Sequence, residues 1–255
     1  MSIDTPLLSV VIPAFNEVDV ITKSLLTVND FLISQEYPWE VIVSDDGSTD
    51  NTIAEVERFI AGHLGFRLLK NEHRGKSNAV RAGIFEASGD YILVTDADLA
   101  VPINEIKRFL LWVHEQGSDL VFASREGKGA KRVGEPYYRH FIGRVFNILI
   151  QIILLPRIFD TQCGFRLFKR SAAQKIFSKL LIYGEDMPIL AKPFFGAFEV
   201  ETLYLAKKMK LKIKELPVVW TYSPTKRLNF FGNSSKMLRD VIKIRWYGLL
   251  GKYKV

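Results

Sequence analysis

Two aspartates, Asp96 and Asp98, follow an apolar run in the stretch "ILVTDADLAVP". On an extended strand they would point to the same side, with Ala97 on the opposite side. Two like charges at the end of a buried strand repel each other, so a compensating cation is expected. Mg²⁺ and Mn²⁺ prefer carboxylate ligands, and Mg²⁺ usually adds substrate phosphates and waters to one or two of them. The pair is therefore a candidate site for a metal-bound phosphate that needs support from its context, and a capped turn into the next helix is the alternative.

A second acidic pair, Asp45 and Asp46, stands in "SDDGSTDNT" at the end of another predicted strand. An acidic side chain at such a strand end can accept hydrogen bonds from the ribose of a nucleotide. The first predicted strand is followed neither by GxGxxG nor by GxxxxGK[ST]. The nicotinamide and Walker-type sites that depend on these glycine-rich loops therefore lose support.

The elements that position these carboxylates follow from the apolar spacing in the first half of the chain. It predicts an α/β fold in which a mostly parallel twisted sheet is flanked by helices, in a Rossmann-like arrangement. Ligands of such sheets bind at the carboxyl ends of the strands, where the acidic pairs lie. The predicted strands cover 7–15, 39–45, 66–71, 90–98 and 118–125, and the predicted helices cover 16–35, 52–63, 75–88 and 103–116.

The second half is less regular. We predict a helix over 137–155 that Pro156 ends, a loop, short strand and helix over 160–177, and a helix over 198–211. An edge strand over 212–222 that tolerates Pro217 and a C-terminal helix over 233–255 complete it. Without repeats or linker-like tracts, the chain is expected to form one domain over 1–255. Its predicted parts are a nucleotide-binding half over about 7–125, an acceptor half over about 126–232 that contains the 137–155 helix, and the helix over 233–255.

Charge is unevenly distributed along the chain. The formal net charge is +7, but residues 125–175 carry a net +8 and residues 226–255 a net +7, so the remainder is acidic. Two basic segments on an acidic body suggest a polyanionic partner, either nucleic acid or an anionic membrane surface. Ordinary solvated faces are the simpler alternative.

A membrane surface fits the pattern of two predicted helices. In the 137–155 helix, four residues form one narrow polar stripe and apolar residues cover the rest; the four are His140, Arg144, Asn147 and Gln151. The C-terminal helix is basic and amphipathic and carries Trp246 and Tyr247 near its end. Such helices suit an interface with anionic lipid, although packing on the sheet or on a partner chain is the alternative.

No pattern in the sequence indicates a membrane span or a leader. No uninterrupted apolar run reaches the roughly 20 residues that a spanning helix needs. The first residues lack the basic and apolar regions of a signal peptide, so neither a transmembrane helix nor a signal peptide is expected. Cys163 is the one cysteine, which excludes an internal disulfide, and we interpret it as a packing residue.

Several motifs in order resemble a known family. "VVIPAFNE", "VIVSDDGSTDNT", "GKSNAVRAG" and "VTDADL" resemble the nucleotide-sugar-binding half of family 2 glycosyltransferases, which have the GT-A fold. "ASRE", "DTQCGFRLFKRSAAQKIF", "FEVETLYLA" and "KIKELPVVWT" resemble the dolichyl-phosphate β-glucosyltransferase branch, which is close to the polyprenyl-phosphate mannosyltransferases. The resemblance covers about residues 7–222.

The resemblance implies a role for each matching position. Asp96 and Asp98 would hold Mg²⁺ or Mn²⁺ and the diphosphate, and they count as catalytic together with Arg125 and Arg139. The nucleotide sugar would be bound by Pro13, Ala14, Phe15, Asn16, Glu17, Asp45, Asp46, Lys76, Asp96, Ala97 and Asp98. The acceptor phosphate would lie near Arg125, Arg132, Arg139, Asp160, Gln162 and Arg166.

The implied activity is inverting transfer of a hexose, above all glucose from UDP-glucose, to a polyprenyl phosphate such as dolichyl or undecaprenyl phosphate. The enzyme would act as a peripheral protein on the cytoplasmic face of a membrane. A GDP-mannose-dependent mannosyltransferase is the nearest alternative. The chain departs from the branch at "GKS", which replaces "GKG", at Glu199, where Asp is usual, and at an apparent insertion over 181–192. The first two departures bear on donor specificity and the insertion bears on the acceptor side.

Three other activities stay open. A family 2 transferase with a hydroxyl acceptor would need a carboxylate base, and the candidates are Glu185, Asp186, Glu199 and Glu201. A nucleotidyltransferase can share this kind of sheet, but the absence of a glycine-rich phosphate loop after the first strand counts against it. A nucleic-acid binder would use the basic segments, and the polar strand ends make that partner unexpected, so no nucleic acid is predicted.

Overall fold

The computed structural model describes residues 6–191, 196–223 and 230–254, with residues 230–234 described by their backbone alone. Lys192 of the predicted insertion and the start of the basic C-terminal segment at 226–229 lie outside the described residues, as do residues 1–5 at the N-terminus.

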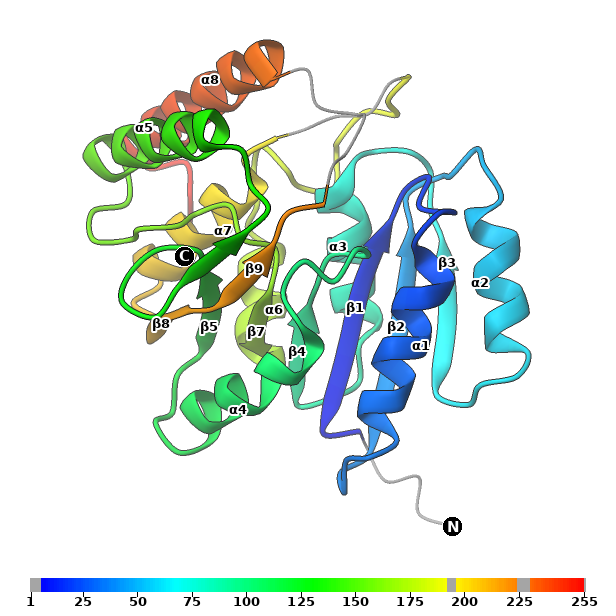
Figure 1. Cartoon of the computed structure of the whole chain (residues 1–255). Coiled ribbons are helices and arrows are strands. Elements are labelled where there is room, and N and C mark those ends of the chain that lie inside the picture. Colours follow the sequence, from blue (N-terminus) through cyan, green and yellow to red (C-terminus); the bar gives the residue numbers. More distant parts are fainter. Residues whose placement is uncertain (1–5, 192–195, 224–229, 255) are drawn as a thin grey trace.

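The described residues form one seven-stranded sheet that runs through both predicted halves (Figure 1). Its strand order is β3-β2-β1-β4-β7-β5-β8, and every neighbouring pair is parallel except the two that involve β7. The predicted mostly parallel sheet is therefore confirmed. The strands are β1 (Leu8–Ala14), β2 (Trp39–Asp45), β3 (Phe66–Lys70), β4 (Tyr91–Val94), β5 (Leu120–Ser124), β7 (Arg166–Lys169) and β8 (Ile213–Pro217).

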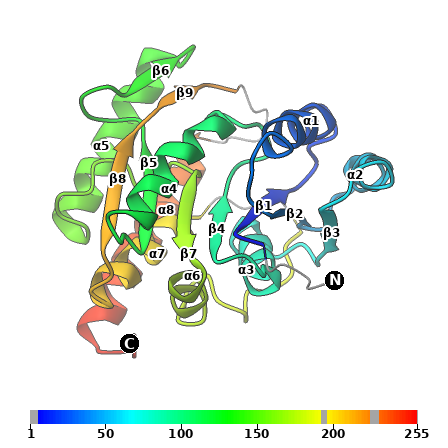
Figure 2. The same ribbon diagram turned by 90° about the horizontal axis from the view of Figure 1, so that it is seen from below.

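Helices cover both faces of this sheet (Figure 2). One face packs on the helices α1 (Ile21–Leu32), α2 (Thr52–Ile60) and α4 (Ile106–His114), the last preceded by the 3₁₀ turn η1 (Ile103–Glu105). The other face packs on α3 (Lys76–Glu86), α6 (Arg170–Phe177) and α7 (Phe198–Lys208). On that second side lie α5 (Tyr137–Ile153) and α8 (Phe230–Leu249), next to each other at one corner of the molecule (Figure 1).

The prediction of one edge strand over 212–222 is wrong in one respect, because this segment forms two strands. Pro217 lacks an N–H group and ends β8, the edge of the main sheet. The chain then leaves the sheet as β9 (Val219–Thr221), which pairs in parallel with β6 (Lys131–Val133). This small ribbon fixes the segment after β5, where three of the predicted site arginines lie.

The C-terminal helix also differs from its prediction. It ends at Leu249 instead of the last residue, because Gly251 adopts a positive φ of 67° that turns the chain. The tail then returns to α7, where the buried Tyr253 donates a hydrogen bond to Glu201 at 2.8 Å.

Candidate active site

The two aspartates of the D-x-D pair lie in a turn, since β4 ends at Val94. The expectation that they extend the strand is therefore wrong. Asp98 Oδ1 accepts the Ala100 N–H at 3.1 Å, and Leu99 has a positive φ of 47°. Ala97 is buried in the core on the α1 side, which leaves Asp96 and Asp98 to the edge of the sheet.

Asp96 has a cationic neighbour. Lys76 Nζ lies 2.5 Å from Asp96 Oδ1 and 3.6 Å from Glu199 Oε1, so one ammonium group joins two carboxylates from different elements. Lys76 is the first residue of α3 and Glu199 lies in the first turn of α7. Burial alone would lower the pKa of Lys76, but the two carboxylates outweigh it and raise that pKa.

The remaining carboxylates of this cluster are shifted toward the neutral form. Burial, together with the charge of Asp96, raises the pKa of Asp98. Burial also raises the pKa of Glu199, although Lys76 and Arg166 oppose the shift. Three carboxylates, those of Asp96, Asp98 and Glu199, thus face two cations, Lys76 and Arg166, and a divalent cation would offset the remaining negative charge.

Gly164 brings the "DTQCGF" loop into contact with Asp96. A Cβ atom at this glycine would lie 2.2 Å from Asp96 Oδ2 and 2.7 Å from its Cγ. A Cβ there would have to displace the Asp96 carboxylate, so the glycine allows the loop to lie directly against it. The adjacent Cys163 is buried, and burial raises the pKa of its thiol to about 12, in keeping with a packing role.

The second acidic pair organises two loops at the end of β2, which β1 separates from β4 in the sheet. Asp45 Oδ1 accepts the Gly47 and Ser48 N–H groups at 2.9 and 2.8 Å, and its Oδ2 accepts the Ser48 hydroxyl at 2.5 Å. Asp46 accepts the Arg74 and Gly75 N–H groups at 3.0 Å each. Both aspartates are buried. Asp45 holds the turn that follows β2, and Asp46 holds the loop that leads to Lys76.

The predicted nucleotide residues that follow β1 lie against the same loops. Pro13 and Ala14 end β1 and pair with Ser44 and Asp45 of β2. Phe15 stacks on the ring of His73 with the centroids 4.1 Å apart. Asn16, with a φ of 53°, accepts the Thr49 N–H at 2.8 Å, and the Glu17 N–H donates to the Thr52 hydroxyl at 2.8 Å.

The insertion contacts this region as well. Arg74 Nη1 donates to the Met187 carbonyl at 2.8 Å, and the Leu190 N–H donates to the His73 carbonyl at 2.7 Å. Arg81 of α3 pairs with Glu185 at 2.7 Å. The inserted segment therefore lies on the donor-side loop that precedes Lys76, and not on the acceptor side alone.

On the other side of the D-x-D turn, Arg125 is held by Asp160. Arg125 Nε and Nη2 donate to the two oxygens of the buried Asp160 at 2.7 and 2.8 Å, and the Arg125 guanidinium lies 5.3 Å from the Trp220 ring. The Arg125 guanidinium keeps the pKa of Asp160 well below its ordinary value, against the effect of burial. Gln162 donates its N–H to Asp160 Oδ1 at 3.0 Å.

The other two arginines that follow β5 are also bonded. Arg132 pairs with Glu126 at 2.7 Å and with Glu135 at 2.6 Å. Arg139 donates to the hydroxyl of Tyr222, the residue after β9, while the Thr221 N–H donates to the Ala100 carbonyl at 2.8 Å. These hydrogen bonds connect the first turn of α5 to the loop of the D-x-D pair.

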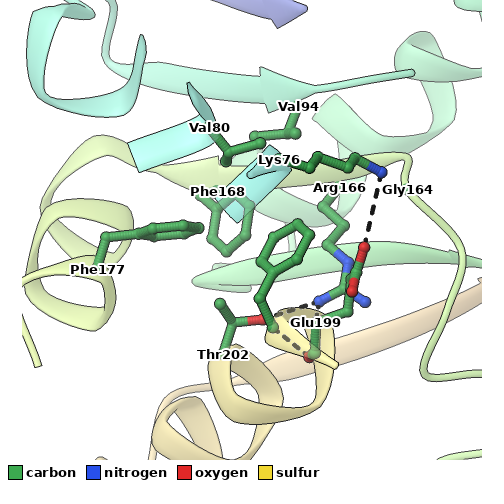
Figure 3. A pocket seen from close by; sticks show the side chains of 10 residues that line it. Lys76, Val80, Val94, Gly164, Arg166, Phe168, Phe177, Glu199 and Thr202 are labelled. Atoms are coloured by element: carbon green, nitrogen blue, oxygen red, sulfur yellow. Dashed lines mark hydrogen bonds and ion pairs between the residues drawn. The ribbon is translucent and has the colours of Figure 1, made fainter. Parts of the chain in front are cut away.

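Arg166 lies beneath the site and is almost completely buried. Its guanidinium donates to the carbonyls of Thr161, Cys163 and Glu199 and to the Thr202 hydroxyl at 2.8 to 3.1 Å. In this structure it joins the "DTQCGF" loop to α7. Figure 3 shows Arg166 below Lys76 and next to Glu199, and all three line a small pocket with Gly164 and several apolar side chains.

Several contributors to this site carry too weak a sequence signal to be singled out. His73 shows no metal-ligand spacing, yet its Nδ1 lies 2.8 Å from Asp46 Oδ2. Gly164 and Trp220 stand inside recognisable motifs, but only the structure shows that one touches Asp96 and the other covers Arg125. Glu199 was predicted as a candidate base and not as a partner of Lys76.

The donor set fits an open metal site. Among the described residues, no group of three or more His, Cys, Asp or Glu side chains is arranged to enclose a metal ion. Asp96 and Asp98 supply one or two carboxylates at an edge of the sheet, and the Asp96 side chain is 35% exposed. This is the arrangement by which Mg²⁺ binds when a substrate's phosphates complete its coordination.

A separate surface lies on α5, whose polar stripe faces the protein. Asn147 is buried and accepts the Thr161 N–H and hydroxyl at 3.2 and 2.9 Å, and Arg144 pairs with Glu126 at 3.2 Å. Ile150 is buried in the core, but other apolar side chains of α5 point outward, and Phe141 and Ile152 are 69% and 77% exposed. Among the described residues, no helix combines the length and the apolar character that a bilayer-spanning segment needs.

Comparison with known proteins adds three findings. Residues 9–177 match the family model described as Glycosyl transferase family 2. The dolichyl-phosphate β-glucosyltransferase of Dictyostelium discoideum is 35% identical, over 99% of this chain and 78% of its own length. The enzyme of the same name from Saccharomyces cerevisiae is 32% identical, over 97% and 76%.

Solved structures share the fold at lower identity. The mannosyltransferase PcManGT from Pyrobaculum calidifontis, in complex with GDP-Man and Mn²⁺, is 21% identical with a TM-score of 0.62, over 94% of this chain and 65% of its own. Glucosyl-3-phosphoglycerate synthase from Mycobacterium tuberculosis, in complex with Mn²⁺, UDP-glucose and phosphoglyceric acid, is 19% identical with a TM-score of 0.65, over 94% and 80%. Both share the arrangement of a sheet between two layers of helices.

Proposed function

Because the chain belongs to glycosyltransferase family 2, we propose that it transfers glucose from UDP-glucose to dolichyl phosphate or a related polyprenyl phosphate, with inversion at the sugar. The names of the two dolichyl-phosphate β-glucosyltransferases reported above support glucose as the sugar and dolichyl phosphate as the acceptor. The observation that carries the proposal is the Asp96–Asp98 turn beside Lys76, on the same sheet edge as the Asp45–Asp46 loops.

The donor would bind along that edge. Phe15, Asn16 and Glu17 and the loops held by Asp45 and Asp46 would surround the nucleotide, and Lys76 would lie near its diphosphate. Asp96 and Asp98 would hold Mg²⁺ or Mn²⁺, which as a Lewis acid neutralises charge on the departing diphosphate. The protein's own contribution is a fixed carboxylate at Asp96, which Gly164 allows the neighbouring loop to contact closely.

The acceptor needs no proton to be removed. The second pKa of a phosphate monoester is about 6, so a lipid phosphate is largely dianionic at neutral pH. One of its oxygens forms the new bond to the anomeric carbon, and the old bond to the diphosphate breaks with its electron pair on the leaving nucleotide. Attack from the opposite side converts an α-linked donor into a β-linked product.

Two anions must approach each other in this reaction, so cations are required on the acceptor side. Arg125, Arg132 and Arg139 follow β5 along the chain, with Arg125 directly after the strand and Arg139 in the first turn of α5. Planar guanidinium groups bind phosphate through paired hydrogen bonds. Arg125 and Arg132 now pair with carboxylates, so a phosphate dianion would have to share or replace those partners.

The lipid acceptor also requires a membrane surface, and the outward apolar face of α5 provides one. An exposed apolar stripe with the polar residues turned inward is unfavourable in water and favourable at a lipid interface. The neighbouring α8 adds the exposed Ile242, Trp246 and Leu249. We therefore infer peripheral attachment through this corner, and we propose the cytoplasmic face as the side of attachment.

A hydroxyl acceptor is the second candidate, because one carboxylate in the site could act as its base. Glu201 accepts the N–H groups of Leu181, Ile182 and Tyr183 and the Tyr253 hydroxyl, and this role in the core occupies both of its oxygens. Glu199 instead lines the pocket beside Lys76, and burial raises its pKa. Competition by short polyprenyl phosphates separates the two acceptors, since a phosphate lipid would not compete with a soluble hydroxyl substrate.

The decisive experiment supplies the purified protein with a polyprenyl phosphate, Mn²⁺ and one radiolabelled nucleotide sugar at a time. Label from UDP-glucose is expected in the lipid phase. Label from GDP-mannose alone would instead identify a mannosyltransferase, and no lipid-phase label from any donor would contradict the proposal.

A further inference from the structure

The cation that contacts Asp96 in this structure is the side chain of Lys76. Its Nζ lies 2.5 Å from Asp96 Oδ1 and 3.6 Å from Glu199 Oε1, and 5.7 Å from the centre of the Phe198 ring. The ammonium group therefore lies where two acidic elements of the site meet, one after β4 and one in α7.

The oxygen that Lys76 contacts is also a ligand expected for the donor's metal. Mg²⁺ binds a carboxylate oxygen at about 2.0 to 2.1 Å, so an ammonium on the same oxygen would place two cations within a few ångströms of each other. Their repulsion in a half-buried site is large. Lys76 and a divalent cation are therefore expected to compete for Asp96.

A second carboxylate lies within reach of Lys76. Its long unbranched side chain is 38% exposed and begins at the N-terminus of α3, directly after Gly75, whose φ is 96°. Glu199, which is 8% exposed, is already within 3.6 Å of the ammonium. A rotation of the side chain alone could move the ammonium from Asp96 to Glu199 without a change in the backbone.

We propose that Lys76 is an internal placeholder for the donor's metal. It holds Asp96 while the site contains no donor, and it releases Asp96 when a divalent cation arrives with a nucleotide diphosphate. The ammonium then pairs with Glu199 and with the diphosphate. This inference rests on the metal-dependent donor site proposed above. It also explains why metal and nucleotide would bind together. Without the nucleotide, the charge of Asp96 is already balanced by Lys76, so the carboxylate attracts a metal ion less strongly.

The test measures Mn²⁺ affinity by electron paramagnetic resonance, with and without UDP, on the folded full chain. Lys76→Met removes the charge and keeps the apolar stem. It is expected to bind Mn²⁺ about three- to tenfold more tightly than the unmodified protein when UDP is absent, since the lost ion pair is half-exposed and the repulsion also disappears. The gain in Mn²⁺ affinity on adding UDP should be smaller in the variant.

A matched control comes from another lysine–carboxylate pair. Lys70 Nζ lies 2.6 Å from Glu57 Oε1 with both side chains 54% exposed, and Lys70→Met should leave Mn²⁺ affinity unchanged. Lys76→Gln, a second neutral variant, must reproduce the gain, and adding Asp96→Asn to Lys76→Met must remove it.

The outcomes separate this inference from the proposed function. Unchanged or weaker Mn²⁺ binding by Lys76→Met without UDP would overturn the placeholder role of Lys76. That result would not bear on the proposed transfer reaction, which the radiolabel assay tests separately. If neither protein binds Mn²⁺ even with UDP present, the metal role of Asp96 fails and the placeholder fails with it.

Discussion

Two regions of the molecule differ in how they expose polar and apolar side chains. One is the donor edge, the carboxyl ends of β1, β2 and β4 with the loops that follow them, and the other is the corner formed by α5 and α8. At the donor edge, Asp45 and Asp46 are buried and Asp96 is partly exposed, and their oxygens accept hydrogen bonds from backbone N–H groups, a hydroxyl and a lysine. At the corner, apolar side chains such as Phe141 and Ile152 are exposed, and the polar Asn147 is buried. Fixed polar groups suit a small charged ligand that must be held in one position, because little reorganisation is then needed. An exposed apolar face suits an extended, fluid partner that needs no fixed register.

Removing the charge of Asp96 should separate the two regions most clearly. Asp96→Asn is expected to lower transfer on the order of 10³-fold, because the carboxylate that holds the metal and diphosphate is lost. Thermal unfolding and vesicle binding should stay close to those of the unmodified protein. Transfer at the normal rate by the purified variant would contradict the metal role of Asp96.

A smaller change tests how strictly the donor edge is fixed. Gly164→Ala would place a Cβ 2.2 Å from Asp96 Oδ2, so the carboxylate or the loop must move. We expect about a 10- to 100-fold loss of transfer, since misplacement by about 1 Å can cost that much. Gly143→Ala in α5 is the control, because a Cβ there meets no atom within 4 Å and should leave activity unchanged. Equal rates for both variants would show that Asp96 is not fixed by this contact.

The corner should respond in a different assay. Phe141→Ser combined with Ile152→Ser is expected to weaken binding to phosphatidylcholine–phosphatidylserine vesicles about tenfold or more, since each side chain would lose roughly 1 to 2 kcal/mol of apolar burial. UDP binding should not change. Leu64→Ser, at a position 95% exposed beyond α2, is the matched control and should bind vesicles normally. Vesicle binding that is the same in all three proteins would exclude α5 as the docking surface.

The smallest effect is expected at Glu185. This side chain is 77% exposed and pairs with Arg81, so Glu185→Gln should change the transfer rate by no more than about twofold. Loss of a general base would instead lower the rate about 10²- to 10⁴-fold. Such a loss, measured at several pH values, would favour a hydroxyl acceptor. It would also show that the inserted segment contributes a residue to the active site.

The order of the first-half elements and the acidic strand ends could be predicted from the sequence, because apolar periodicity and polar interruptions are local features. The position of Asp96 and Asp98 beyond the strand could not. Val94 pairs with Arg166 of β7, a residue far along the chain, and this is where the ladder of β4 ends. The apolar run "ILVT" contains no sign of that limit.

Which charged groups pair with each other could not be predicted from the sequence either. Arg125 and Asp160 are 35 positions apart, and their bidentate contact depends on the loop that returns toward β7. The amphipathic character of α5 was predictable from its spacing. The interaction that turns its polar stripe inward was not, because it requires Asn147 to meet Thr161.

The antiparallel strand β7 has a consequence for how the protein is made. It lies between β4 and β5, although both precede it in the chain, so each presents an unpaired edge until residues 166–169 emerge from the ribosome. At about 5 to 20 residues per second, synthesis from Ser124 to Arg166 takes roughly 2 to 8 s. During that interval the nascent chain has two apolar strands open to wrong partners and no Gly164 beside Asp96. The donor site is therefore completed only by a segment from the acceptor half, and a chain truncated after β5 should aggregate instead of binding nucleotide.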